Sequence, residues 1–287
     1  MRGVGSPASR FLVSSGKGMI RYFNQNISVD GERIAGIQSS SLSCPVPFAP
    51  INALGLGFYD QEIRGEISSS FSIETSIVTT GNVFGNFFAP KNFKWDSGDT
   101  PVGITGALMS SYEFSAGVGQ IVGENFSFSV FGDVDVEAGT VEHTDVDVYV
   151  GRPDGITLSL SEFSTQSVQS VTYTMDMTPQ SRKKCGQYLT GRDYFRAPPF
   201  EVSISVEFDV KASEFTGLYD QICAPRQENI EITLANVCDD TPIRSLSAEN
   251  ARLVNFSTTA SIGENRSVTL EFKAFANSTG QAMEWLT

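Results

Sequence analysis

Hydrophobic and polar residues alternate along several long segments of this chain. Between Phe200 and Val210 the apolar side chains take every even position and the polar ones every odd position. The same period of two recurs over 170–177 and over 63–74. Each segment therefore predicts a strand with one buried and one polar face. Such strands exceed the usual five or six residues, a length that suits sheets continued across subunits or curled into barrels.

Helical periodicity is sparse along the chain. Residues 212–223 are the best candidate, because Ser213 can cap the segment and apolar residues recur at helical spacing before Pro225 ends it. A weaker candidate lies around 246–251. The pattern as a whole predicts a mostly β fold with one or two short helices, and the Ser-, Gly-, Thr-, Val- and Phe-rich composition agrees with that class.

Two stretches of the chain resemble each other at a separation of 140 residues. GENFSFSVF at 123–131 aligns with GENRSVTLEF at 263–272, and an even separation (263 minus 123, or 140) keeps inward positions inward. Each copy predicts a β-hairpin, at 112–131 and at 252–272, with a tight turn at Gly-Glu-Asn.

The order of other segments supports an internal duplication. Ile37-Gln38-Ser39 matches Val168-Gln169-Ser170, and residues 62–74 match 199–209 in pattern. We therefore expect an extended N-terminal arm at 1–30, a first β domain at 31–150 and a second, related β domain at 151–287.

The charge is strongly acidic and unevenly distributed. The formal net charge is −13 and the pI is near 4.5, which disfavours nucleic-acid binding through phosphate contacts. Before Asp30 the charged residues are all basic: Arg2, Arg10, Lys17 and Arg21. The arm of one copy is expected to dock on the acidic body of another, the alternative being a solvated terminus. No run of 18 apolar residues and no secretory signal is found.

Few residues could carry catalysis or bind a metal. His143 is the single histidine, so no second histidine can complete a catalytic triad or a paired-histidine metal site. The four cysteines lack metal-ligand spacing and are expected to be reduced, buried, small hydrophobic residues: Cys44, Cys185, Cys223 and Cys238. Residues 151–155 (GRPDG) predict a turn, and no GxSxG, Walker or GxGxxG motif is present. We expect no enzymatic activity and no cofactor.

Five carboxylates alternate with valines near the end of the first half: Asp133, Asp135, Glu137, Asp145 and Asp147. They could bind Ca²⁺ or act as general acid and base. Calcium loops, however, use irregular backbone to converge their oxygens, whereas alternation spreads carboxylates along one face of a hairpin. A solvated acidic face is therefore the favoured interpretation.

Residues 253–260, Gly263-Glu264-Asn265 and 267–272 together resemble the end of the tail tube proteins of long-tailed bacteriophages and contractile injection machines. The resemblance covers about residues 34–277 and rests on pattern rather than on a diagnostic motif. It implies a β-sandwich domain, six copies of which close a barrel around a channel, so the fold would be a duplicated, barrel-forming tube domain. It also implies that rings stack through loops and terminal arms.

The resemblance assigns roles to the charged segments. The five alternating carboxylates would face the lumen, and DNA would pass without specific binding because like charges repel. Arg2, Arg10, Lys17 and Arg21 would latch one ring to the next. A doubled domain leaves the ring as either a trimer or a hexamer. Sheath, tape measure or baseplate proteins are the further partners implied, with no membrane, and the location would be the virion tail.

Two alternatives remain open at this point. One is a related virion component that forms no tube: a baseplate hub, a tail terminator or a capsid decoration protein. The other is a secreted carbohydrate-binding β-sandwich, which would use the Asn-x-Ser/Thr tripeptides; the absence of a signal peptide and the two tryptophans, Trp95 and Trp285, speak against it.

Overall fold

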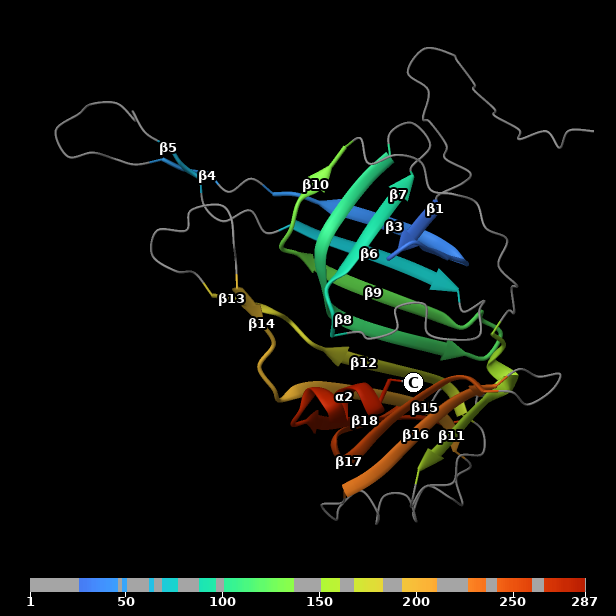
Figure 1. The fold of residues 1–287 in the computed structure, drawn as a ribbon. Helices are drawn as coiled ribbons and strands as arrows, with labels where there is room; N and C mark the ends of the chain where they lie inside the picture. Colours follow the sequence, from blue (N-terminus) through green and yellow to red (C-terminus); the bar gives the residue numbers. More distant parts are fainter. Residues whose placement is uncertain are drawn as a thin grey trace, which may run out of the picture.

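A computed structural model of the chain is mostly β and is built on one large antiparallel sheet that does not close into a barrel (Figure 1). The mostly β class predicted from the alternation is therefore confirmed. The structure describes residues 26–45, 48–50, 62–64, 69–76, 88–96, 101–136, 151–160, 168–182, 193–210, 227–235, 242–259 and 266–286.

The first half of the chain contributes eight strands to the large sheet: β1 (Asn26–Val29), β2 (Glu32–Ile34), β3 (Ile37–Ser43), β6 (Ser69–Ser76), β7 (Lys91–Asp96), β8 (Pro101–Gly117), β9 (Gly123–Val130) and β10 (Val134–Asp135). Six of them lie side by side in the order β1-β7-β8-β9-β6-β3. Strand β2 pairs with the other edge of β1, and β10 pairs with β8. A separate small hairpin joins β4 (Phe48–Pro50) to β5 (Glu62–Arg64).

The second half contributes six strands to the same sheet: β11 (Ile156–Leu160), β12 (Val168–Asp176), β15 (Phe200–Val210), β16 (Gln227–Ala235), β17 (Pro242–Thr259) and β18 (Arg266–Ala276). Their spatial order is β11-β16-β17-β18-β15-β12. A 3-10 turn (Pro153–Gly155) precedes β11, a small hairpin joins β13 (Gln180–Arg182) to β14 (Asp193–Phe195), and helix α2 (Thr279–Glu284) follows β18.

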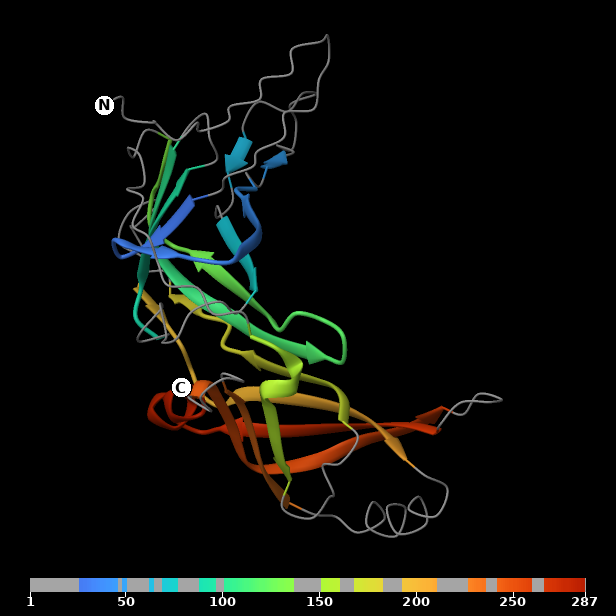
Figure 2. The same cartoon turned by 90° about the vertical axis from the view of Figure 1, so that its right-hand side faces the viewer.

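The two halves share one strand topology. Numbered by chain order within each half, the six strands follow the spatial order 1-4-5-6-3-2 in both. Strand β3 thus corresponds to β12, β6 to β15, β9 to β18 and β8 to β17. Figure 2 shows the two halves one above the other along the long direction of the molecule.

Irregularities of pairing fall at matching places in the two halves. The register shifts between Ile37 and Ser39 in β3 and between Val168 and Ser170 in β12, within the tripeptides that match in sequence. It also shifts between Met109 and Ser111 in β8 and between Leu253 and Asn255 in β17. β-Bulges bend and twist a sheet locally, so the large sheet is bent at equivalent positions in its two halves.

The bulges correct the separation of 140 residues. Met109 pairs with Phe128, and Leu253 pairs with Phe272, so β9 and β18 correspond at a separation of 144 (272 minus 128). The first hairpin turns at 118–122, and Gly123 is already the first residue of β9, where it pairs with Ser115 of β8. The expected turn at Gly123–Asn125 is therefore wrong, while Gly263–Asn265 lies outside the described residues.

The apolar face of each predicted strand forms the core. In β15 the even residues Phe200, Val202 and Ile204 are buried while the intervening residues are partly exposed, as the alternation predicted. In the first half Phe71, Phe93 and Phe128 pack together, with ring centroids 5.1 Å apart for Phe71 and Phe93 and 4.8 Å apart for Phe93 and Phe128. Burying each aromatic ring contributes on the order of 2–3 kcal/mol.

The structure tests two of the three predicted short elements, the helix around 246–251 and the turn at 151–155. The helix expected around 246–251 is wrong, because this segment lies within β17. The helix expected at 212–223 lies outside the described residues. Helix α2 begins at Thr279, and the hydroxyl of its N-cap residue, Ser278, accepts a hydrogen bond from the backbone NH of Gln281. The turn predicted at 151–155 is confirmed, with the Gly155 NH donating to the Arg152 carbonyl at 3.0 Å.

The structure differs from the sequence predictions for one cysteine and for the end of the N-terminal arm. Cys44 is exposed and carries a free thiol, so the expectation of burial is wrong for it. Residues 26–29 of the expected arm form β1, which pairs with β7. Residues 1–25, the other three cysteines and His143 lie outside the described residues.

Candidate functional site: the polar face and the junction between the halves

One continuous polar face extends across both halves of the chain. Directly paired residues form a row through seven strands: Ser39, Glu74, Asn125, Glu113, Thr174, Ser203 and Lys273. Residues that are directly opposite in a sheet share a face. The row therefore places one side of β3, β6, β9, β8, β12, β15 and β18 on a common surface, to which the end of β17 adds Asn255, Ser257 and Thr259. We call this surface the polar face.

Equivalent hydrogen bonds tie neighbouring strands together on the polar face of each half. The Ser39 hydroxyl donates to Glu74 at 2.9 Å, and the corresponding Ser170 hydroxyl donates to Glu207 at 3.2 Å. The Ser267 hydroxyl also donates to Glu207, at 2.6 Å. These contacts hold the carboxylates along the sheet in an extended arrangement instead of converging them on one point.

The polar face has an excess of negative charge. Among the described residues its carboxylates are Glu74, Glu113, Asp176, Glu201, Glu207, Asp209 and Glu271. Its cations are Arg252 and Lys273, and Lys273 forms an ion pair with Glu201. A hydroxyl-rich surface with excess carboxylates repels polyanions and offers them few attachment points.

The halves meet where β12 pairs with the end of β8. The ladder runs from Ser170 opposite Gly117 to Asp176 opposite Ser111. On its inward side lie Tyr112 and Tyr173, which are 1% and 0% exposed and whose rings are 6.4 Å apart. The hydroxyl of Tyr173 donates to the Ser247 carbonyl at 3.1 Å. The junction is thus a continuation of the sheet with its own packed core.

A buried ion pair crosses this junction. The Arg244 guanidinium on β17 lies 3.0 Å from the carboxylate of Glu124 on β9, and their side chains are 13% and 4% exposed. The Tyr112 hydroxyl donates to the same carboxylate at 2.8 Å. Burial, together with the Glu124 charge, raises the pKa of Tyr112 well above its ordinary value, and burial also raises the pKa of Tyr173. The neutral phenols and the ion pair therefore form one locked cluster between the halves.

A second partly buried cation, Arg196, lies between β14 and β15 and contacts residues of the first half. The Arg196 guanidinium donates to the Met109 carbonyl at 2.7 Å and lies 5.0 Å from the ring centre of Phe88. Burial lowers the pKa of Arg196 to about 10. The carbonyl and the aromatic face offset part of the loss of hydration, so this cation is placed to hold structure.

The acidic residues expected to line the lumen are only partly in view. Asp133 and Asp135 are exposed, beside and within the short strand β10, and the Asp133 NH donates to the Thr105 hydroxyl at 2.9 Å. Glu137, Asp145 and Asp147, and the arm residues Arg2, Arg10, Lys17 and Arg21, lie outside the described residues. The polar face was not among the predicted sites, although the alternating Glu, Ser and Asp positions of 200–210 belong to it.

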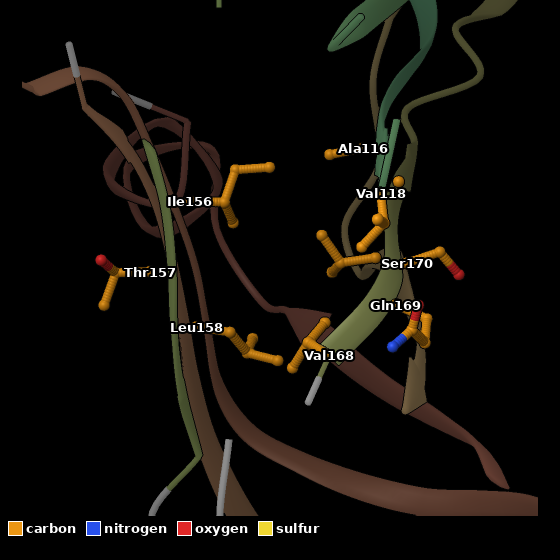
Figure 3. A pocket seen from close by; sticks show the side chains of 10 residues that line it. Ala116, Val118, Ile156, Thr157, Leu158, Val168, Gln169 and Ser170 are labelled. Atoms are coloured by element: carbon orange, nitrogen blue, oxygen red, sulfur yellow. The ribbon is translucent and has the colours of Figure 1, made fainter. Parts of the chain in front are cut away.

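A hollow of about 220 Å³ opens at the end of the β8–β12 ladder. Figure 3 shows Ile156 and Leu158 of β11 facing Val118 and Val168 across it. Its lining contains no ionisable side chain. Within the described ranges no three His, Cys, Asp or Glu residues gather as metal ligands, and no helix there is long and apolar enough to cross a membrane.

Comparison with known proteins gives no family for this chain. No protein-family model matches the sequence, and no curated protein matches it. The polar face, the duplicated topology and the junction therefore carry the functional argument by themselves.

Proposed function

We propose that this chain is a tail tube subunit of a long-tailed phage or a related injection machine. In this proposal copies close into rings, the rings stack, and the polar face lines the channel through which DNA passes. The observation that supports it most is the continuous polar face, which extends over eight strands of a sheet whose other side is the core. A channel for a polyanion needs a hydrated surface with few cations, and the polar face has that composition.

The duplication supports a ring built from few chains. Each half contributes four long strands to the polar face: β3, β6, β9 and β8 from the first, and β12, β15, β18 and β17 from the second. Because rings of the resembled family contain six such domains, three copies of a doubled chain supply the same number. Closed cyclic symmetry satisfies every interface in such a ring.

Electron microscopy of the purified protein tests the proposal. Stacked rings with an open channel are the expected result. A single closed ring instead indicates a hub, a terminator or a decoration protein, and monomers at every concentration overturn the proposal.

Phage carrying charge reversals test the channel lining. Glu113→Lys with Glu271→Lys should slow DNA ejection, because both residues lie on the polar face and the new cations attract phosphate. The matched control, Asp133→Lys with Asp135→Lys, reverses the same number of charges at exposed residues of β10 and its approach. If the control slows ejection and the polar-face variant does not, the channel is lined by another surface.

A further inference from the structure

We infer that β3 of one copy pairs antiparallel with the Asn255–Thr259 segment of β17 in a second copy, in the register that β12 and β8 adopt within one chain. The pairing of copies follows from the strand topology, and only its closure into a ring rests on the proposed function. The interface would repeat, between chains, the junction that joins the two halves inside each chain.

The internal junction supplies the template. Strand β8 has β9 on one edge, while its other edge pairs with β7 over Pro101–Ala107 and with β12 over Ser111–Gly117. The first part of strand β17 is likewise paired on both edges. Arg252 pairs with Gln227 of β16 on one edge and with Lys273 of β18 on the other. Beyond Arg252, no described strand pairs with the edge of β17 that faces away from β18.

The complementary edge lies at the other end of the row of strands. Strand β3 corresponds to β12, and Figure 1 shows it at the end of the series β12, β8, β9, β6, β3. It pairs with β6 on one side, and no described strand pairs with its other side. In β12 the matching side is the one that pairs with β8. Among the described strands, each chain therefore ends in one edge of each kind.

The repeat also fixes the register of the inferred pairing. Residues of β12 correspond to β3 at a separation of 131 (168 minus 37), and residues of β8 correspond to β17 at 144 (253 minus 109). The internal pair Thr174–Glu113 therefore translates to Ser43–Ser257, and Thr172–Ser115 translates to Ser41–Thr259. All four translated residues are exposed.

Burial and edge composition agree with this assignment. Leu42 and Phe256 are half-buried in the isolated chain, and their internal counterparts, Tyr173 and Tyr112, are 0% and 1% exposed. Proteins usually protect open edges with charged residues or proline. The seven residues of β3 (IQSSSLS) and the segment NFSTT of β17 contain neither. The end strand β2, by contrast, is three residues long and carries Glu32 and Arg33.

Unlike edges give a heterologous interface. One copy offers β3 and the next offers β17, so copies join head to tail, and such contacts generate a closed ring when the rotation between copies allows it. The polar face is continued by Ser41 and Ser43 meeting Thr259 and Ser257. The partner is thus a second copy of this chain.

Disulfide trapping tests the register. The Met177 NH donates to the Ser110 carbonyl and the Val118 NH to the Gln169 carbonyl, both at 2.8 Å, so by alternation Thr174 and Glu113 form a non-hydrogen-bonded pair. The equivalent Ser43 and Ser257 would have Cα atoms about 4.5 Å apart, within the range that a disulfide spans. Cys44→Ser removes the exposed native thiol beside this position.

In the Cys44→Ser background, Ser43→Cys with Ser257→Cys should give covalent oligomers under mild oxidation. The yield should be about tenfold above that of the matched control Ser43→Cys with Thr259→Cys, whose cysteines are two residues out of register. Mixing copies that carry only Ser43→Cys with copies that carry only Ser257→Cys should give dimers of one of each. Circular dichroism checks that all variants retain the strand signal.

The cross-linking results distinguish a failure of the inferred interface from a failure of the proposed function. Cross-linking of the control pair, of Ser43→Cys to itself, or of Ser43→Cys with Ser159→Cys on β11 overturns the inferred interface, even if microscopy shows tubes. Efficient cross-linking of Ser43→Cys with Ser257→Cys establishes the interface. If those cross-linked chains form neither rings nor tubes, the proposed function fails while the interface stands. No cross-link in assembled tubes rejects the interface.

Discussion

The ion pair between Glu124 and Arg244 offers the sharpest test of how the two halves are held together. In Arg244→Met the apolar stem is retained and the guanidinium is lost. The Glu124 side chain is 4% exposed, so its carboxylate stays buried with the Tyr112 hydroxyl still donating to it. Removing one member of a buried pair costs about 3–5 kcal/mol, because an uncompensated charge remains. We expect Arg244→Met to lose stability in that range.

The reverse change should cost less. In Glu124→Leu the Arg244 guanidinium remains 13% exposed and still donates to the Ile243 carbonyl at 2.9 Å, so water and a carbonyl relieve part of the loss. The double variant removes both charges and should return to within about 1.5 kcal/mol of the parent. The coupling of the two substitutions is therefore expected to be large and favourable.

Urea unfolding, followed by circular dichroism and tryptophan fluorescence on monomeric protein, measures these values. Lys273→Met serves as the control, because the pair of Lys273 with Glu201 is 44% and 42% exposed and should contribute less than about 1 kcal/mol. A loss below about 1 kcal/mol for Arg244→Met, or strict additivity in the double variant, would refute the view that this pair locks the halves.

Three other predictions test separate parts of the molecule. The pKa values of Tyr112 and Tyr173 are raised on folding, so the stability they contribute is complete below the ordinary tyrosine pKa of about 10 and is lost as pH rises beyond it. The free energy of unfolding, measured from pH 8 to 11, should show this loss. Tyr112→Phe should make the loss smaller. Gly132→Ala should lower the free energy of unfolding by about 1–3 kcal/mol or more, because a Cβ there would lie 2.4 Å from the Thr105 carbonyl oxygen. Gly280→Ala, whose Cβ would have no neighbour closer than 4.0 Å, should instead raise it by up to about 1 kcal/mol through α2. Equal urea midpoints for the two variants would contradict this. Deleting residues 1–20 should shorten stacked polymers in sedimentation while single rings persist, and unaltered polymer length would rule out the arm as an inter-ring contact.

The long strands could be predicted because burial of one face of a strand requires apolar residues at every second position of the sequence. Phe200–Val210 is an example, with eleven residues alternating without interruption. The error at 246–251 has a physical cause. The pairing of β17 with β16 shifts between Ala248 and Ala251, and Asn250 has a φ of +56° there. The bulge therefore spaces the buried residues Leu246, Ala248 and Ala251 irregularly, and that spacing resembles the face of a helix.

The candidate site was harder to predict because distant segments build it. Glu124 and Arg244 are 120 positions apart, and no local pattern marks either as a partner of the other. The repeat was visible in the sequence, but the Gly-Glu-Asn match set its spacing four residues short. Bulges at Ser110 and Val254 define the correct spacing, and a bulge has no reliable signature in a single sequence.

The buried ion pair at the internal junction has no counterpart at the edge inferred to join two copies. At a separation of 144, the residue that corresponds to Glu124 is Val268, which is 0% exposed within its own chain. Two halves on one polypeptide meet every time the chain folds, so a buried charge there always finds its partner. Two separate copies meet only when concentration allows. An apolar residue at the equivalent position leaves no unsatisfied charge there in a chain that has not met a second copy.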